Sequence, residues 1–229
     1  MNNLKIIGTS HIARQSIDEI QKSVEEDKPD IIAVELDVQR AAALLEQKKT
    51  KISLREIAKI GVRGYVFVKI GQYVQQRLGK MVGVAPGSEM KTALELAQKK
   101  GLQVAFIDQP IHATLQNFSR QLTWKEKGRF FLELFSGLFF PKKQMKKYGL
   151  EKFDLKSVPE KEVIAKIINE MKKQYPSVYK TLITDRNKYM VKQLVKLLRQ
   201  HPEKKILAVV GAGHKEGMEK LLLKVDVVR

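Results

Sequence analysis

The sequence predicts an α/β fold in which a mostly parallel central sheet is flanked by helices. Its short apolar runs read as buried strands, because parallel strands covered on both faces are continuously hydrophobic. Stretches with helical spacing separate these runs. No strand-like run occurs from His112 to about Gln200, which places a large helical insertion at about 112–202. The predicted strands are 4–7, 31–34, 103–107 and 205–210.

The first forty residues form a predicted β-α-β unit. Ser16 is the expected N-cap of its helix, with Glu19 three residues on as the capping-box partner. Strands 4–7 and 31–34 flank this helix, so we expect them to run parallel and as neighbours in one sheet.

The remaining segments complete this architecture. Residues 38–82 read as largely helical and basic, and Ser88 is expected to cap a helix that Gly101 ends. A short helix near 215–223 and an edge strand at 225–228 close the chain. Strands 4–7 and 205–210 lie at opposite ends of the sequence, and we expect them to belong to the same sheet. We therefore treat residues 1–229 as a single domain.

Composition excludes several kinds of chemistry. The chain has no cysteine, which rules out disulfides, thiolate zinc sites, iron–sulfur clusters and a cysteine nucleophile. Its 43% hydrophobic and 30% charged residues suit a well-packed protein. Neither a signal peptide nor about 20 consecutive apolar residues occur, so we expect a soluble cytoplasmic protein.

The net charge is +18 and unevenly distributed. Residues 48–80 hold nine basic residues against the single acid Glu56, and a second basic stretch runs over 125–156. Such a field attracts anionic surfaces, although a lysine-rich solvated surface explains it equally.

Residues able to do chemistry stand at the ends of the predicted strands. Parallel strands gather their carboxyl ends at one edge of the sheet, where ligands bind. A carboxylate such as Glu35, placed directly after an apolar run, is costly unless it is paired or coordinated. Asp108 suits either a site or a helix cap. The strand ends are Gly8–His11, Glu35–Asp37, Asp108 and Gly211–His214. Two histidines and two acids there fit either a metal site or an acid–base site.

The sequence around these residues resembles the TraB/PrgY (TraB/GumN) family. The matching motifs follow one another in order over nearly the whole chain. They are Gly8-Thr-Ser-His11, Pro29 to Arg40, Pro86 to Met90, Ile107 to Ile111 with Thr114 and Arg120, Asp185 to Met190, and Val209 to His214.

This resemblance implies a fold shared with the erythromycin-esterase-like and ChaN-like proteins. It also implies relatives that are metal-dependent proteases (the Tiki group) or that reduce pheromone activity in conjugative bacteria. By matching position, it points to His11, Glu35 and His214 as the site. Groups that orient substrate or support the site would then be Arg40, Glu89, Asp108, Arg120, Asp185 and Arg186.

The first functional hypothesis is a metal-dependent hydrolase, a peptidase acting on peptide or amide bonds. His11 and His214 would bind a divalent ion of the manganese, cobalt or zinc class, with Glu35 as third ligand or general base. Arg40 or Arg186 would stabilise the developing oxyanion.

The sequence departs from the family pattern at two motifs. Gln109 stands where many members have arginine, and Asp185-Arg186-Asn187 where many have Glu-Arg-Asp. The loss of a positive charge beside Asp108 is expected to alter substrate choice or weaken activity.

The alternative is a non-enzymatic regulator that sequesters a peptide or docks on a membrane or partner. Its support is the basic field and the Phe-rich segment 128–140, which reads either as an interfacial or oligomerising helix or as a core helix of the insertion. The expected partners are a peptide or protein substrate, an anionic membrane surface and a second copy of the chain. Nucleic acid is not expected. Because many relatives continue into membrane helices, the chain could also be the soluble part of a membrane-anchored form.

Overall fold

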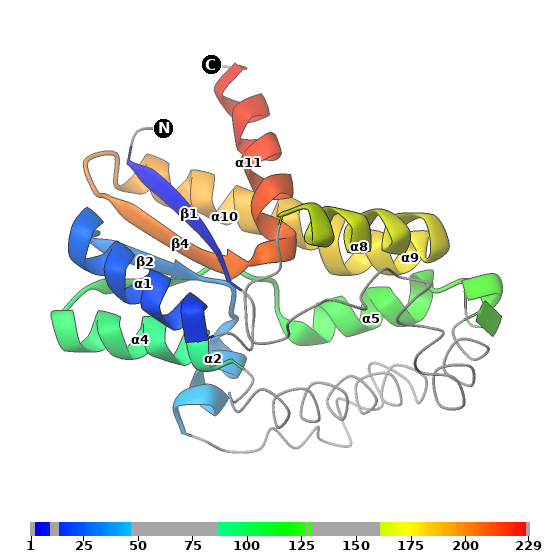
Figure 1. Cartoon of the computed structure of the whole chain (residues 1–229), viewed down its shortest axis with the longest axis horizontal. Coiled ribbons are helices and arrows are strands. Elements are labelled where there is room, and N and C mark those ends of the chain that lie inside the picture. Colours follow the sequence, from blue (N-terminus) through cyan, green and yellow to red (C-terminus); the bar gives the residue numbers. More distant parts are fainter. Residues whose placement is uncertain (1–2, 10–13, 47–86, 127, 130–160, 228–229) are drawn as a thin grey trace.

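The computed structural model describes residues 3–9, 14–46, 87–126, 128–129 and 161–227 (Figure 1). Its strands are β1 (Leu4–Thr9), β2 (Ile31–Val34), β3 (Gln103–Phe106) and β4 (Ile206–Gly211). Its helices are α1 (Arg14–Asp27), α2 (Val38–Leu45), α4 (Ser88–Lys100), α5 (Ile111–Gln121), α8 (Lys161–Gln174), α9 (Pro176–Tyr179), the π-helix η1 (Lys180–Thr184), α10 (Asp185–Gln200) and α11 (Ala212–Val227).

The described strands form one parallel sheet in the order β1-β4-β2-β3. The predicted parallel sheet is confirmed, but the prediction that the first two strands are neighbours is wrong. β4 lies between them, pairing Gly8 with Val210 on one side and Val34 with Val209 on the other. All six residues of β4 are buried, which suits the interior of the sheet.

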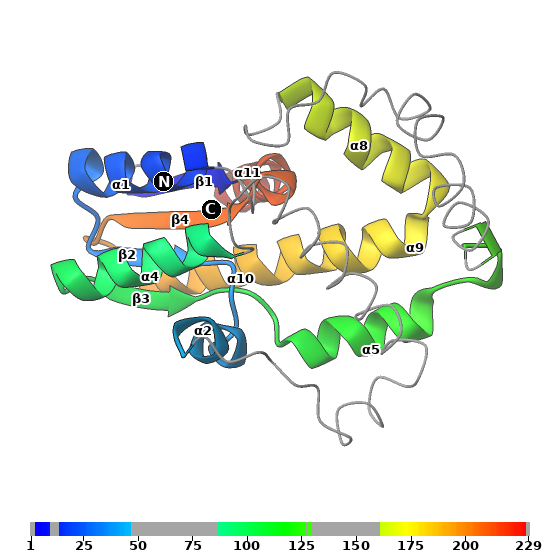
Figure 2. The same ribbon diagram turned by 60° about the horizontal axis from the view of Figure 1, so that its bottom comes forward.

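Helices cover both faces of the sheet (Figures 1 and 2). Alternate strand residues face opposite ways, so Ile32 and Val209 pack with α1, α2 and α4, while Ala33 and Ala208 pack with α10 and α11. The helices α5, α8 and α9 lie beyond the carboxyl ends of the strands (Figure 2). The carboxyl edge of the sheet is therefore bordered by helices that all follow β3 in the chain.

Three predicted local features are wrong. Ser16 lies inside α1, fully buried, rather than at its N-cap, because the helix already begins at Arg14. Ser88 is the first residue of α4, and Gly87 takes the cap position with a left-handed φ of 81°. The predicted edge strand at 225–228 is largely helical, because α11 continues to Val227.

Several predictions fall outside the described residues. These are His11, the helical segment beyond residue 46, the basic stretch 48–80, most of the basic stretch 125–156, and all but two residues of the segment 128–140. Within the described part of the chain, no helix is both long and apolar enough to cross a membrane.

Candidate functional site

Four chain segments meet at the carboxyl edge of the sheet. Glu35 directly follows β2, Asp108 lies two residues past β3, and His214 lies in the first turn of α11 after β4. The fourth segment is the first turn of α10, which supplies Arg186 and Asn187. We call these five residues the Arg186 cluster.

Arg186 holds the cluster together. Its Nε and Nη2 donate to the two oxygens of Asp108 at 3.1 and 2.7 Å, a bidentate pair. The same Nη2 forms a short ion pair with Glu35 Oε1. Its Nη1 lies 3.2 Å from His214 Nε2. Burial acts to lower the pKa of Arg186, but the carboxylates of Glu35 and Asp108 outweigh it and raise that pKa, so the guanidinium stays charged.

Glu35 is fixed by two different donors. The backbone N–H of Gly211, at the end of β4, donates to its Oε2 at 2.6 Å. Its Oε1 takes the ion pair with Arg186 and lies 3.3 Å from His214 Nε2. The side chain is 4% exposed, so these contacts supply the pairing that a buried carboxylate requires. The sequence-based inference that Glu35 must be paired is confirmed.

The hydrogen bonds of His214 define its tautomer. Its Nδ1 lies 2.6 Å from Asn187 Oδ1, an atom that can only accept, so Nδ1 carries the proton and donates. Its Nε2 then keeps a lone pair and accepts from Arg186, which can only donate. Asn187 therefore orients the basic nitrogen of His214 toward Glu35 and Arg186.

Two glycines allow α11 to approach its neighbours closely. A Cβ on Gly217 would lie 2.3 Å from Asn187 Nδ2, so only glycine leaves room for the Asn187 side chain. A Cβ on Gly8 would lie 3.1 Å from Ala212 Cα. Gly8 lies inside β1 and Gly211 is the last residue of β4, and the two described glycines with positive φ are Gly87 and Gly101.

A π-helix directly precedes the arginine. In η1 the wider i→i+5 bonding includes Asp185 N–H donating to Lys180 O. Such segments occur often at functional sites, because one extra residue re-aims the side chains that follow. Here it sets the start of α10, and Arg186 Nη1 also donates back to Leu182 O at 3.4 Å.

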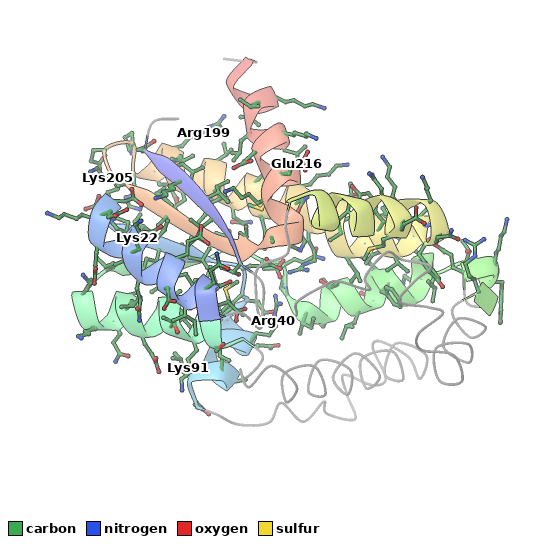
Figure 3. The ribbon with its side chains drawn as sticks, in the orientation of Figure 1. Lys22, Arg40, Lys91, Arg199, Lys205 and Glu216 are labelled. Carbon is green, nitrogen blue, oxygen red and sulfur yellow. The ribbon has the colours of Figure 1, made fainter. Side chains whose placement is uncertain are left out.

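A second arginine extends the network toward solvent. Arg40 Nη2 donates to Asp108 Oδ2 at 2.6 Å, and its Nε donates to Asp37 Oδ2 at 2.7 Å. Arg40 is 27% exposed, compared with 14% for Arg186. Figure 3 shows Arg40 beside the carboxyl ends of the strands. The accessible side of the cluster thus carries guanidinium groups.

Asp37 joins two helix starts. It is the N-cap of α2, accepting from Arg40 N at 2.9 Å, and it also accepts from Ile111 N at the start of α5. Burial acts to raise the pKa of Asp37, but the hydrogen bonds and charge of Arg40 and the Ile111 N–H lower it overall. Asp108 does not cap α5; Pro110 holds that position.

The other predicted site residues lie in varied places. Glu89 is buried in the first turn of α4 at 1% exposure. Arg120 is exposed in the last turn of α5, and Asp185 pairs with Lys180 at 2.9 Å. Gln109 donates from its side chain to Thr114 Oγ1 and from its backbone to Asp108 Oδ1.

Residues that sequence reasoning left out of the site are Asn187 and Asp37. Both stand inside the motifs quoted for the family resemblance, beside Arg186 and three residues before Arg40 respectively. For Asn187 that position was the only signal, because the sequence does not show how the helix that contains it packs against His214. Asp37 also stands at the end of a predicted strand, two residues after Glu35.

Glu35 and His214 cannot both bind a divalent ion while the Arg186 guanidinium stays where it is. The 3.3 Å between Glu35 Oε1 and His214 Nε2 would suit two ligands of one ion bound at about 2.0–2.2 Å. However, the Arg186 guanidinium already contacts both atoms, so an ion there would face a fixed positive charge. Among the residues described, no three His, Asp or Glu side chains form a metal-binding group. Since His11 lies outside those residues, the metal set His11, Glu35 and His214 stays a prediction.

Fold and site together define a parallel α/β protein with a carboxylate–guanidinium–imidazole centre at the carboxyl edge of its sheet. The chain belongs to the TraB/PrgY/gumN family, which matches residues 2–225. The resemblance drawn from the sequence motifs is thereby confirmed.

The chain is similar to longer proteins from an archaeon and from mammals. An uncharacterized protein of Methanocaldococcus jannaschii is 32% identical over 226 residues, which cover 98% of this chain and 54% of that protein. The human TraB domain-containing protein is 24% identical, covering 94% of this chain and 61% of its own length. This chain thus spans somewhat more than half of each. Among solved structures, an open-conformation mutant of the erythromycin esterase EreC matches with a TM-score of 0.32 and 15% identity, covering 91% of this chain and 60% of that one.

Proposed function

We propose that this chain is a hydrolase that cleaves peptide or amide bonds at the Arg186 cluster. The observation that carries the proposal is the orientation of His214. Its Nδ1–H is held by Asn187, and its Nε2 lone pair faces Glu35 and Arg186. An imidazole with its Nδ1–H held and a lone pair on Nε2 is the arrangement that general base catalysis requires, and the substrate would have to draw Arg186 Nη1 away from Nε2 for that lone pair to act.

The roles follow from exposure and charge. Arg186 is the most exposed member of the hydrogen-bonded core that it forms with Glu35, Asp108 and His214, so a substrate carbonyl oxygen would meet its guanidinium first. That cation would stabilise the negative charge that develops on the oxygen. Asp108 holds the guanidinium with two hydrogen bonds, and Arg40 steadies Asp108 from the solvent side.

The reaction would need one proton to move twice. His214 Nε2 takes a proton from water as the water oxygen attacks the carbonyl carbon, which forms a tetrahedral intermediate. The intermediate then collapses, the bond to the leaving nitrogen or oxygen breaks, and Nε2–H returns the proton to that atom. Glu35, 3.3 Å from Nε2, stabilises the imidazolium between the two transfers.

A substrate screen with matched variants tests the proposal. The purified chain of residues 1–229 is assayed with peptide p-nitroanilides and p-nitrophenyl esters, alongside His214→Ala. We expect His214→Ala to lower kcat/KM by about a hundredfold or more, the usual contribution of a general base. His112→Ala is the matched control, because His112 is exposed in α5 and away from the cluster. Equal rates for His214→Ala and the unmodified chain would contradict the assignment.

The metal-dependent form of the proposal has its own assay. Activity is measured after dialysis against a chelator and after addition of manganese, cobalt or zinc. Loss and recovery, together with loss in His11→Ala, would support the predicted set His11, Glu35 and His214. Activity that is indifferent to the chelator would leave the hydrolysis to the Arg186 cluster alone.

A further inference from the structure

A groove lies between α10 and α11 and is lined by residues of both helices. The two helices pack against each other over the sheet face opposite α1 and α4 (Figures 1 and 2). The groove has a volume of about 770 Å³, within the range of binding sites in proteins. Arg199, one of its lining residues, is labelled near the end of α10 in Figure 3, far along the helix from Arg186 at its start.

The floor of the groove is apolar. Val191 and Val195 come from α10, and Leu221 and Val225 come from α11. Each pair is four residues apart, so each lies one above the other along its helix. Three of these side chains are only partly buried, and Val191 is buried at 5% exposure. Together they form a hydrophobic strip parallel to the helices.

The rim of the groove is strongly basic. Lys188, Lys192, Lys196 and Arg199 line it at helical spacing along one side of α10. No acidic residue lines the groove, and no ion pair joins these four to the other described residues. Like charges four residues apart destabilise a helix, so this row has a cost that the described residues do not offset. From 188 to 199 it spans about 16 Å at 1.5 Å per residue.

We propose that this groove binds an acidic amphipathic helix, whose apolar side covers the valine–leucine floor and whose carboxylates face the basic row. An amphipathic helix can present an apolar side next to a row of acidic residues. When these residues repeat every three or four positions, their spacing matches that of the basic row on α10. A fatty acid would match one of the four cations with its single carboxylate. A phosphate polymer would leave the apolar floor uncovered. The proposal is independent of the hydrolase assignment.

Binding of a designed peptide tests the proposal. The probe is a labelled helical peptide of about 16 residues, long enough to span the row, with leucines on one face and glutamates flanking them. A peptide of the same composition with leucines scattered around the helix serves as a control. Fluorescence anisotropy with the full chain should show saturable binding of the first peptide, weakened by salt, and at least about tenfold weaker binding of the second.

Charge reversal localises the binding. Lys192→Glu/Lys196→Glu should weaken peptide binding by about tenfold or more, a difference of about 1.4 kcal/mol. The matched control is Lys22→Glu/Lys99→Glu, which reverses two exposed lysines on α1 and α4, on the other face of the sheet. If the reversed variant fails to fold, Lys192→Gln/Lys196→Gln removes the charges without adding repulsion.

Each result decides the proposal. Equal binding of the two peptides, or of the native chain and the Lys192/Lys196 variants, would overturn it. Binding of laurate or of anionic phosphatidylserine vesicles that depends on Lys192 and Lys196, with no binding of the peptide, would also overturn it in favour of a lipid.

Discussion

At the scale of single residues, the site depends on the space that Gly217 leaves for the carboxamide of Asn187. Asn187 fits between His214 and Gly217 because Gly217 has no Cβ. The carboxamide in turn decides which nitrogen of His214 is basic. A residue outside the predicted catalytic set thus orients one inside it.

Gly217→Ala tests this dependence. The new Cβ would lie 2.3 Å from Asn187 Nδ2 and force that side chain away, so we expect kcat to fall about tenfold or more, the cost reported for lost orienting partners. Thermal unfolding should show a folded protein. Gly213→Ala in the same helix is the matched control, because its nearest heavy atom would be an ordinary 3.8 Å away.

A structural effect and a positioning effect can be separated by the pH profile. Asn187→Asp places a carboxylate against His214 Nδ1 and stabilises the imidazolium relative to the unmodified chain. The acidic limb of the activity profile should then move to higher pH, while Gly213→Ala leaves it in place. An unchanged limb in Asn187→Asp would show that Asn187 does not act through His214.

Arg186 also stabilises the fold, because it neutralises the buried carboxylates of Glu35 and Asp108. Arg186→Met would leave Glu35 buried without a guanidinium partner and Asp108 paired with Arg40 alone, and we expect a loss of about 3–5 kcal/mol in the free energy of unfolding. Urea denaturation measures the loss. Arg120→Met is the control, because Arg120 is exposed on α5, and it should change stability by no more than about 0.5 kcal/mol.

At the scale of secondary structure, Asp37 links α2 to α5 across 74 residues of chain. Its carboxylate caps one helix and accepts from the first N–H of the other. The direction in which Arg40 points therefore depends on the same residue that positions α5. This connection places Arg40 against Asp108 and sets the open side of the site.

Because the pKa of Asp37 is lowered in the folded state, its contribution to the free energy of unfolding should decrease at low pH. Its folded pKa lies below the ordinary value of 3.8, so the stabilisation is complete above that value and is lost as pH falls through the folded pKa. Asp37→Asn should lower the free energy of unfolding at pH 7 by about 1–3 kcal/mol, because an amide nitrogen replaces one acceptor.

The comparison of unfolding curves at several pH values checks this expectation. The difference between Asp37→Asn and the unmodified chain should begin to shrink below about pH 4, where the aspartate of the unfolded chain takes up a proton, and it should be lost as pH falls through the lower folded pKa. Asp18→Asn, exposed on α1, serves as the control. A difference that stays constant down to pH 2 would assign the effect to packing instead of charge.

Element boundaries show what local sequence could predict. The apolar runs at β2 and β4 were placed within a residue or two, because a fully buried strand has no polar positions. Ser16 and Val225 were misread because tertiary packing prevailed over local signals. Ser16 is buried inside α1. In α11, Met218 and Leu222 pack into the core, and the helix continues past them through the β-branched residues near its end.

At the scale of the whole molecule, the sequence predicted the class of sheet and the edge that carries the chemistry. It did not predict the strand order, because a run that is buried on both faces fits any interior position equally well. It placed Glu35, Asp108 and His214 together through a general property of parallel sheets. Arg186 entered the predicted site only through the family resemblance, because its contacts with Glu35 and His214 depend on how η1 and α10 fold over the sheet edge.

The central position of β4 has a consequence for synthesis of the chain. Nearly two hundred residues separate β1 from β4, the strand that β1 and β2 both pair with. At about 5–20 residues per second, ribosomes would take roughly 10–40 s to supply the strand that joins them. During that interval β1 has no partner among the described strands, and β2 can pair only with β3. The nascent protein should therefore depend on chaperone protection until β4 emerges, and Glu35 should acquire its Gly211 hydrogen bond only then.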